Sequence, residues 1–140
     1  MHLRLGAVSN IPAADDVLDS DEAVYDLPAV ASLLRIPVSK VIQHLKERHL
    51  LGVRRGGSVV VPKVFFENGR VVKSLPGLLV VLHDGGFEDT EIVRWLFTPD
   101  ESLTVIRDGG TAPQSNARPV DALHSHQARE VVRRAQAMAY

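Results

Sequence analysis

Hydrophobic residues between positions 26 and 62 change their spacing along the chain. Over residues 27–34 and again over residues 38–48 they recur at helical spacing, with polar residues between them. Asp26 is placed to cap the first helix, because its short carboxylate can accept from the free N–H groups of the first turn. Pro37 disfavours a helical residue before it, so we expect a turn between the two helices.

A short hairpin is predicted directly after the second helix. Two apolar runs, residues 50–53 and 58–61, flank the sequence Arg54-Arg55-Gly56-Gly57. Paired glycines permit the positive φ that tight hairpin turns need, and Pro62 ends the second strand because it cannot donate to a ladder. Helix, turn, helix and basic hairpin together predict a winged helix-turn-helix.

The remainder of the chain predicts a mainly α protein with this hairpin as its wing and a helical C-terminal extension. Asn68-Gly69 predicts a turn before a short strand. We expect Asp89 or Thr90 to cap a helix that ends before Pro99. The expected helices of this part cover residues 78–83, 90–97 and 125–137. The expected organisation is an acidic flexible tail (1–25), a winged helix-turn-helix (26–75) and a helical C-terminal domain (76–140).

Charge is unevenly distributed along a chain whose net charge is only −1. Residues 26–75 contain nine basic and three acidic residues, whereas residues 1–25 contain one basic and five acidic residues. Positive charge concentrated on a helix-turn-helix is the footprint of a phosphate-binding face. Double-stranded DNA is therefore the predicted partner. The candidate contacts are Ser39, Lys40, Gln43, His44 and Lys46 on the second helix, Arg54 and Arg55 in the wing, and Arg48, Lys63 and Lys73 as secondary phosphate contacts.

Several segments also carry a resemblance to known families. Residues 26–34 and 36–41 look like the opening of MerR-type and excisionase-type winged helices. More specific segments are Leu75-Pro76-Gly77-Leu78-Leu79, Leu82-His83-Asp84-Gly85-Gly86, Trp95-Leu96-Phe97, Arg118-Pro119-Val120-Asp121-Ala122-Leu123 and Val131-Val132-Arg133-Arg134-Ala135-Gln136-Ala137. Together they resemble a small actinobacterial family of winged-helix DNA-binding proteins with its own C-terminal helical domain.

The resemblance implies a cytoplasmic DNA-binding protein. Together with the charge pattern, it leads us to expect a transcriptional regulator or a nucleoid-associated factor. The resemblance also implies a Ser/Thr protein kinase as a partner, because a mycobacterial member is phosphorylated in its N-terminal tail. That acceptor does not carry over cleanly, since residues 1–25 contain no Thr; Ser9 is the candidate here. A second hypothesis is that the acidic tail folds onto the basic face and weakens DNA binding, which a phosphate would reinforce.

An alternative class is a protein-interaction adaptor that uses the C-terminal half. Spaced residues including Trp95, Pro99, Leu103 and Leu123 faintly resemble the C-terminal domain of Xre/MbcA/ParS-type antitoxins, which bind a toxin. Helix-turn-helix outlines also occur in adaptors, so both classes stay open.

The sequence predicts neither an enzyme nor a cofactor. It contains no nucleophile elbow and no phosphate-binding glycine loop in the required context. There is no cysteine, and the six histidines show no metal-ligand spacing, so no metal site is predicted. No apolar run reaches the length of a membrane span, and no signal-peptide core is present, so the expected location is the cytoplasm.

Overall fold

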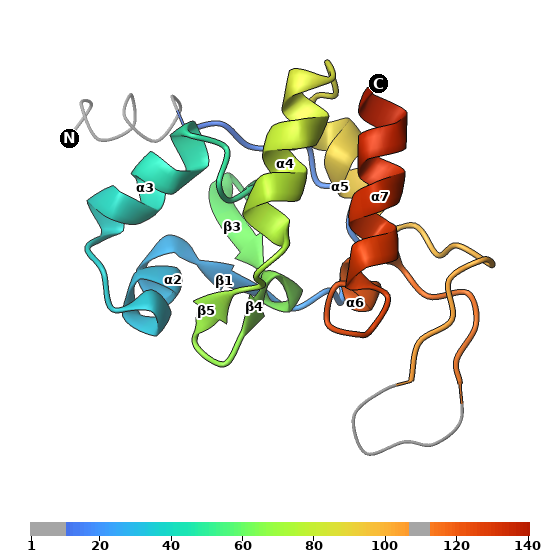
Figure 1. The fold of residues 1–140 in the computed structure, drawn as a ribbon. Coiled ribbons are helices and arrows are strands. Elements are labelled where there is room, and N and C mark those ends of the chain that lie inside the picture. Colours follow the sequence, from blue (N-terminus) through green and yellow to red (C-terminus); the bar gives the residue numbers. More distant parts are fainter. Residues whose placement is uncertain (1–10, 107–112) are drawn as a thin grey trace.

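The N-terminal half folds around a small sheet flanked by two helices. The computed structural model describes residues 11–106 and 113–140, so the prediction for Ser9 lies outside the described residues. In Figure 1 the two helices lie beside the sheet, on the side away from the C-terminal helices. The elements of this half are β1 (Val24–Asp26), α2 (Leu27–Leu34), α3 (Val38–Lys46), β2 (Val53–Arg55) and β3 (Ser58–Pro62).

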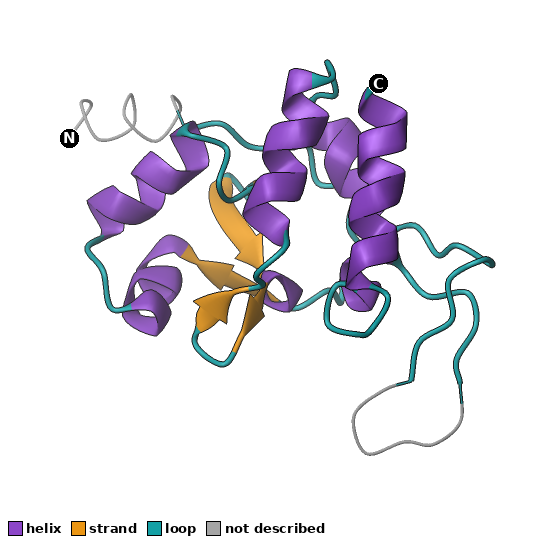
Figure 2. Ribbon diagram, in the orientation of Figure 1, coloured by secondary structure: helices purple, strands orange, loops and turns teal. Residues whose placement is uncertain are grey.

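The predicted hairpin is present, and a third strand extends it. β2 and β3 pair antiparallel, and Gly56 and Gly57 have φ values of 61° and 80° in the turn between them. β1 pairs with the other edge of β3, giving the strand order β1-β3-β2. Nothing in the local sequence predicts β1, because its partner lies far along the chain. Figure 2 shows the strands in the middle of this half, beside α2 and α3.

Both helices of the helix-turn-helix begin where the sequence predicts. The Asp26 carboxylate accepts from the Ala29 N–H at 2.8 Å, which confirms the predicted cap. Arg35 ends α2 in the left-handed conformation, with a φ of 59°. Pro37 then precedes α3, and its carbonyl accepts from the N–H of Lys40 at 3.0 Å.

A short connection leads from the wing to the C-terminal helices. It consists of a 3₁₀ turn (η1, Lys63–Phe65) and a two-residue hairpin, β4 (Phe66–Glu67) with β5 (Arg70–Val71). Asn68 and Gly69 turn this hairpin with positive φ, as predicted. Phe65 is fully buried and is part of the hydrophobic core.

The C-terminal half is helical, which confirms the predicted fold class. It contains α4 (Leu75–Asp84), α5 (Asp89–Phe97), α6 (Pro119–Ala122) and α7 (Ala128–Ala139). α4 and α7 lie side by side in Figure 1. The predicted cap of α5 was wrong. Glu88 occupies that position and forms a capping box with Glu91, because Asp89 is already within the helix.

One hydrophobic core joins the two halves. Buried residues run continuously from Ile11 through the helix-turn-helix to Ala135 in α7, and the described residues include no buried polar or charged residue. Gly85 permits the close approach of α4 and α7: a Cβ at this position would lie 2.7 Å from the Cβ of Ala139. The two predicted domains therefore share a single core. No helix among the described residues is long and apolar enough to cross a membrane.

Residues 11–23, which we call the acidic arm, are docked on the fold. Ile11 and Ala14 are buried, and Ala14 bridges to Val53: its N–H donates to the Gly52 carbonyl at 2.8 Å. The structure therefore contradicts a flexible tail through residue 25, as far as residues 11–25 are concerned. The prediction failed because composition does not reveal pairing with a distant strand.

Candidate nucleic-acid interface

The exposed face of α3 carries most of the residues predicted to contact DNA. Val41 and Leu45 are buried beneath the helix. Four of the five predicted contacts on this helix lie on its exposed side: Ser39, Lys40, Gln43 and Lys46. This face offers two ammonium groups, an amide and a hydroxyl, which suits contact with phosphates and base edges.

His44 is placed differently from its neighbours on α3. It is half-buried, and its ring lines an apolar hollow together with Leu34, Leu50, Val71 and Pro76. Its Nδ1 is buried and has no hydrogen-bond partner among the described residues. His44 is therefore poorly placed for a direct contact with a base.

The two wing arginines differ in their surroundings. Arg54 is exposed, and its guanidinium donates to the Ile11 carbonyl at 3.3 Å. Arg55 is bound by the acidic arm: its guanidinium donates to both carboxylate oxygens of Asp16, at 2.9 and 3.1 Å. It also donates to the carbonyls of Glu22 and Asp19, at 3.1 and 2.9 Å. The hydrogen bond from Arg55 lowers the pKa of Asp16 below its usual value, so the carboxylate stays ionised near neutral pH.

The secondary phosphate candidates are also unequal. Lys63 is exposed, and its ammonium lies 5.0 Å from the centre of the Tyr25 ring. Lys73 is exposed in the turn before α4. Arg48 is engaged elsewhere, because it donates to Asp89 at 2.8 Å. Lys63 and Lys73 are therefore more accessible than Arg48.

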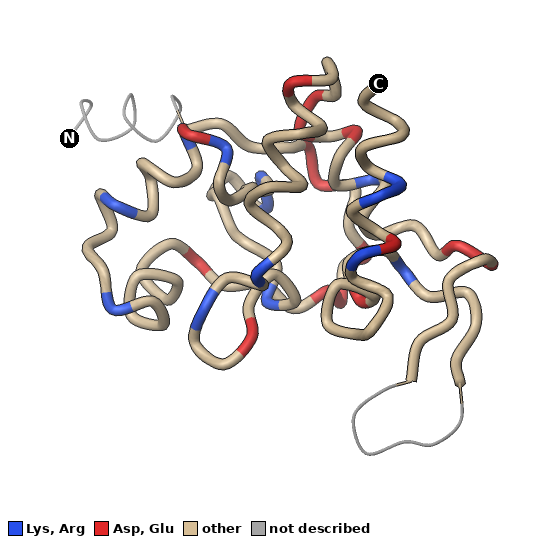
Figure 3. The backbone as a smooth tube through the Cα atoms, viewed as in Figure 1, with Lys and Arg blue, Asp and Glu red and all other residues tan. Residues whose placement is uncertain are grey.

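Sequence reasoning missed one exposed cation of this surface. Arg35 lies in the turn between α2 and α3, where it lines a hollow together with Pro37 and Val38. Figure 3 shows Lys and Arg distributed around α3 and the turn before it. A basic residue in the turn of a predicted helix-turn-helix was the signal that could have identified it.

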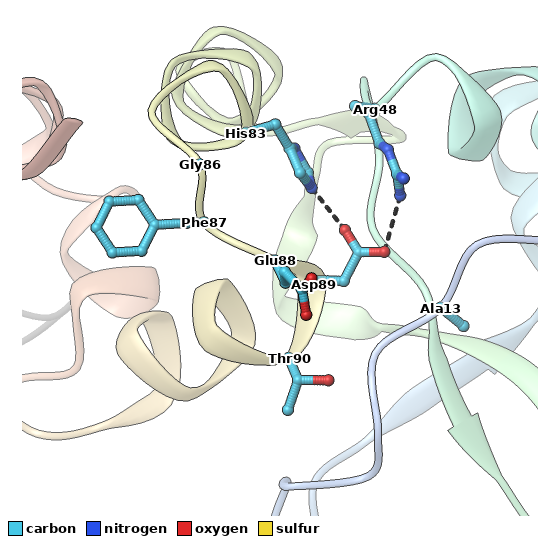
Figure 4. A pocket seen from close by; sticks show the side chains of 8 residues that line it. All are labelled: Ala13, Arg48, His83, Gly86, Phe87, Glu88, Asp89 and Thr90. Carbon is cyan, nitrogen blue, oxygen red and sulfur yellow. Dashed lines mark hydrogen bonds and ion pairs between the residues drawn. The ribbon is translucent and has the colours of Figure 1, made fainter.

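A second cluster of charged side chains lies where the two halves meet. Asp89 accepts from Arg48 on one oxygen and lies 2.6 Å from His83 Nε2 on the other, as Figure 4 shows. The other ring nitrogen of His83 lies 2.8 Å from the carbonyl of Leu79. The two ring nitrogens of His83 thus face a backbone carbonyl and a carboxylate.

This cluster lines a cavity of about 380 Å³ at the junction, next to Ala13 of the acidic arm. Burial raises the pKa of Asp89, but the hydrogen bond from His83 and the charge of Arg48 outweigh it, so the pKa is lowered overall. Arg48, His83 and Asp89 are thus paired with one another in the protein. These contacts hold the C-terminal half against the end of α3.

The remaining polar links tie the acidic arm to the C-terminal half. The N–H of Asp15 donates to the hydroxyl of Thr90 at 3.0 Å. Glu22 accepts from Arg118 at 2.5 Å, and Arg118 also pairs with Asp121. The hydrogen bonds from Arg118 to Asp121 and Glu22 raise the pKa of Arg118 despite its burial, so this arginine stays charged. The arm thus connects the wing to α5 and α6.

Three potential metal ligands come together at the end of α3. They are His44, Glu47 and His49, whose ligand atoms all lie within 4.8 Å of one another. The spacing of these residues gave no such signal in the sequence, because the chain reverses between them.

The fold and this surface define a winged helix-turn-helix protein with a helical C-terminal half. A family model for this type of protein, described as "DNA-binding protein Rv2175c, wHTH domain", matches residues 10–66. A second model, described as "Rv2175c C-terminal domain of unknown function", matches residues 72–139. The chain belongs to the Rv2175c family.

A relative of known sequence and a solved structure of the same name agree with this assignment. The chain is 72% identical over 137 residues to DNA-binding protein Rv2175c of Mycobacterium tuberculosis, covering 97% of this chain and 94% of that protein. An NMR structure of Rv2175c superposes with a TM-score of 0.86 at 71% identity, covering 96% of this chain and 92% of that one. These matches confirm the predicted resemblance to a family of winged-helix DNA-binding proteins with its own C-terminal domain. The winged-helix model begins at residue 10, so it includes the acidic arm.

Proposed function

We propose that this protein binds double-stranded DNA, with the exposed face of α3 in the major groove and the wing against the phosphate backbone. The observation that carries the proposal is the exposed set of polar side chains on α3 beside a basic hairpin. Membership of a family described as DNA-binding supports it. The contacts fall into two groups: Ser39, Lys40, Gln43 and Lys46 in the groove, and Arg54, Lys63, Lys73 and Arg35 at phosphates.

Arg55 joins this interface only after it leaves the acidic arm. Its two bonds to Asp16 and two backbone carbonyls occupy the guanidinium in the free protein. A phosphate would have to replace these acceptors. We propose that the acidic arm weakens DNA binding by this competition. We also propose that the protein acts as a regulator at promoters or as a nucleoid-associated factor.

Further proposals concern the protein partners and the cellular location. A Ser/Thr kinase acting in the N-terminal segment, with Ser9 as the acceptor, is supported by the family resemblance. A protein partner for the C-terminal half is the alternative function, and it is supported by the exposed apolar side chains of Met138 and Tyr140 at the end of α7. A cytoplasmic location follows from the proposed DNA partner.

The proposal is tested by fluorescence anisotropy with a labelled mixed-sequence duplex over a series of salt concentrations. Each lost phosphate contact reduces the slope of log K against log salt by about 0.9. Arg54→Ala is therefore expected to reduce the slope by about that amount. Lys40→Ala combined with Gln43→Ala tests the groove contacts of α3.

The matched control is Arg129→Ala, which removes an exposed arginine from α7 on the other half. Its effect should be much smaller than that of Arg54→Ala. Equal losses in both variants would show only nonspecific attraction, and undiminished binding in the α3 and wing variants would refute this interface. If the full chain bound no duplex even at low salt, the alternative partner-binding function would be favoured.

A further inference from the structure

The end of α3 brings two histidines and a carboxylate to one place. Arg48 adopts the left-handed conformation, with a φ of 63°, and reverses the chain after the helix. The N–H of His49 then donates to the carbonyl of His44 at 3.0 Å. This reversal sets the two rings 6.2 Å apart, centre to centre, with Glu47 between them in the sequence.

The three side chains provide one ligand atom each, all within 4.8 Å of one another. Ligand atoms in a tetrahedral zinc site lie about 2.1 Å from the metal, hence roughly 3.4 Å apart. The ligand atoms must therefore approach by at most about 1.4 Å. Glu47 and His49 each have side chains that are 48% exposed, so small rotations can provide this movement.

The surroundings favour a bound cation. The buried Nδ1 of His44 has no hydrogen-bond partner among the described residues, so turning this atom toward a metal ion breaks no hydrogen bond. The nearest contact between His49 and Glu47, Nδ1 to Oε1, is 3.7 Å. The C-terminal end of a helix also carries partial negative charge, which stabilises a cation there.

We propose that His44, Glu47 and His49 form a binding site for a divalent transition-metal ion of the zinc class. Two imidazoles and one carboxylate suit Zn²⁺ and its neighbours, whereas Mg²⁺ and Ca²⁺ prefer sets of oxygen ligands. The fourth position is filled by water. The sequence prediction of no metal site is thereby revised, because ligand spacing along the chain does not show the reversal at Arg48.

The site has a consequence for α3, and this consequence rests on the proposed function. Glu47 Oε2 now accepts from the side-chain amide of Gln43 at 3.2 Å. A metal that draws both oxygens of the Glu47 carboxylate toward itself releases this amide, which can then reach a base edge. The ion also adds two positive charges beside α3. His44 thus influences DNA binding through the metal instead of through a base.

The site itself is tested by isothermal titration calorimetry of the untagged full-length protein with Zn²⁺. Wild type should bind one equivalent. His49→Ala and Glu47→Gln should each weaken binding by about tenfold or more, since losing a direct ligand costs at least as much as losing a residue that only orients one. Both positions are exposed, so these variants should retain the fold, as checked by circular dichroism.

His126→Ala is the matched control, because His126 is exposed and distant in sequence from α3. It should bind Zn²⁺ as wild type does, and Mg²⁺ should produce no binding heat at this site. NMR of the imidazole groups should show the resonances of His44 and His49 shifting first. Absence of Zn²⁺ binding, or binding undiminished in both ligand variants, would overturn the proposal.

Anisotropy with the duplex, with and without Zn²⁺, tests the coupling separately. Zn²⁺ should lower the Kd and steepen the salt dependence for wild type but not for His49→Ala. Zn²⁺ binding with an unchanged Kd would refute the coupling and leave the site standing. Failure of every form to bind DNA would refute the proposed function, and the calorimetry would still decide the metal site.

Discussion

The contact between Asp16 and Arg55 gives the sharpest prediction about the acidic arm. In the free protein the Arg55 guanidinium makes a two-bond contact with the Asp16 carboxylate, and the two side chains are 22% and 32% exposed. The acidic arm takes four of the five N–H donors of Arg55, so a two-bond contact with a phosphate requires Arg55 to give up part of this pairing. The substitution Asp16→Asn removes the charge of the partner while keeping its size.

The magnitude follows from the geometry. An ion pair near the surface with good two-bond geometry is worth about 1 kcal/mol. If all of this opposes DNA binding, its removal tightens the Kd by about fivefold. The carbonyls of Asp19 and Glu22 still accept from Arg55, so fivefold is an upper value for the variant. Release of Arg55 should also steepen the salt slope by about 0.9, the contribution of one phosphate contact.

The assay is fluorescence anisotropy over a salt series, arranged as a double-mutant cycle. Asp15→Asn is the matched control, because it removes the same charge from an adjacent, exposed residue. Asp15 bonds to Thr90 through its backbone N–H and not through its carboxylate. The difference between the two variants isolates the pair from general charge. In an Arg55→Ala background, Asp16→Asn should have no more effect than Asp15→Asn.

Two results would refute the reasoning. Equal gains from Asp15→Asn and Asp16→Asn would mean that only net charge matters. A gain from Asp16→Asn that persists in the absence of Arg55 would mean that the arm acts through some other contact. Thermal unfolding of each variant would show whether loosening of the arm, rather than release of Arg55, changed the affinity.

Two further predictions concern stability. The pKa of Asp89 is lowered in the fold, so its stabilisation is fully present above the pKa of the unfolded chain, about 3.9, and is lost as the pH falls through the lower folded value. Urea unfolding between pH 7 and pH 3 should therefore show a steeper loss of stability on acidification in wild type than in Asp89→Asn; parallel curves would contradict it. Gly85→Ala should destabilise by about 1–3 kcal/mol, because the added Cβ would lie 2.7 Å from the Cβ of Ala139. Gly77→Ala in the same helix meets nothing within 4 Å and should not destabilise, so equal losses in the two variants would disprove the close-approach argument.

The sequence by itself determined the local structure. Asp26, Pro28 and Pro37 mark the helix-turn-helix, because a side-chain cap and a proline ring each restrict only the neighbouring residues. Gly56-Gly57 marks the wing, because a tight turn with positive φ is also a local feature. Hydrophobic spacing likewise predicted a mainly α protein. The exposed face of α3 was predictable for the same reason, since helical periodicity fixes which side chains share a face.

Only the tertiary structure decided which of the predicted cations are free. Arg55 and Arg48 are as basic in the sequence as Arg54, yet each is paired with a carboxylate from a distant segment. The docking of residues 11–23, the shared core of the two halves, and the meeting of His44 with His49 have the same cause. Each depends on where the folded chain places residues, which residue type and local spacing do not specify.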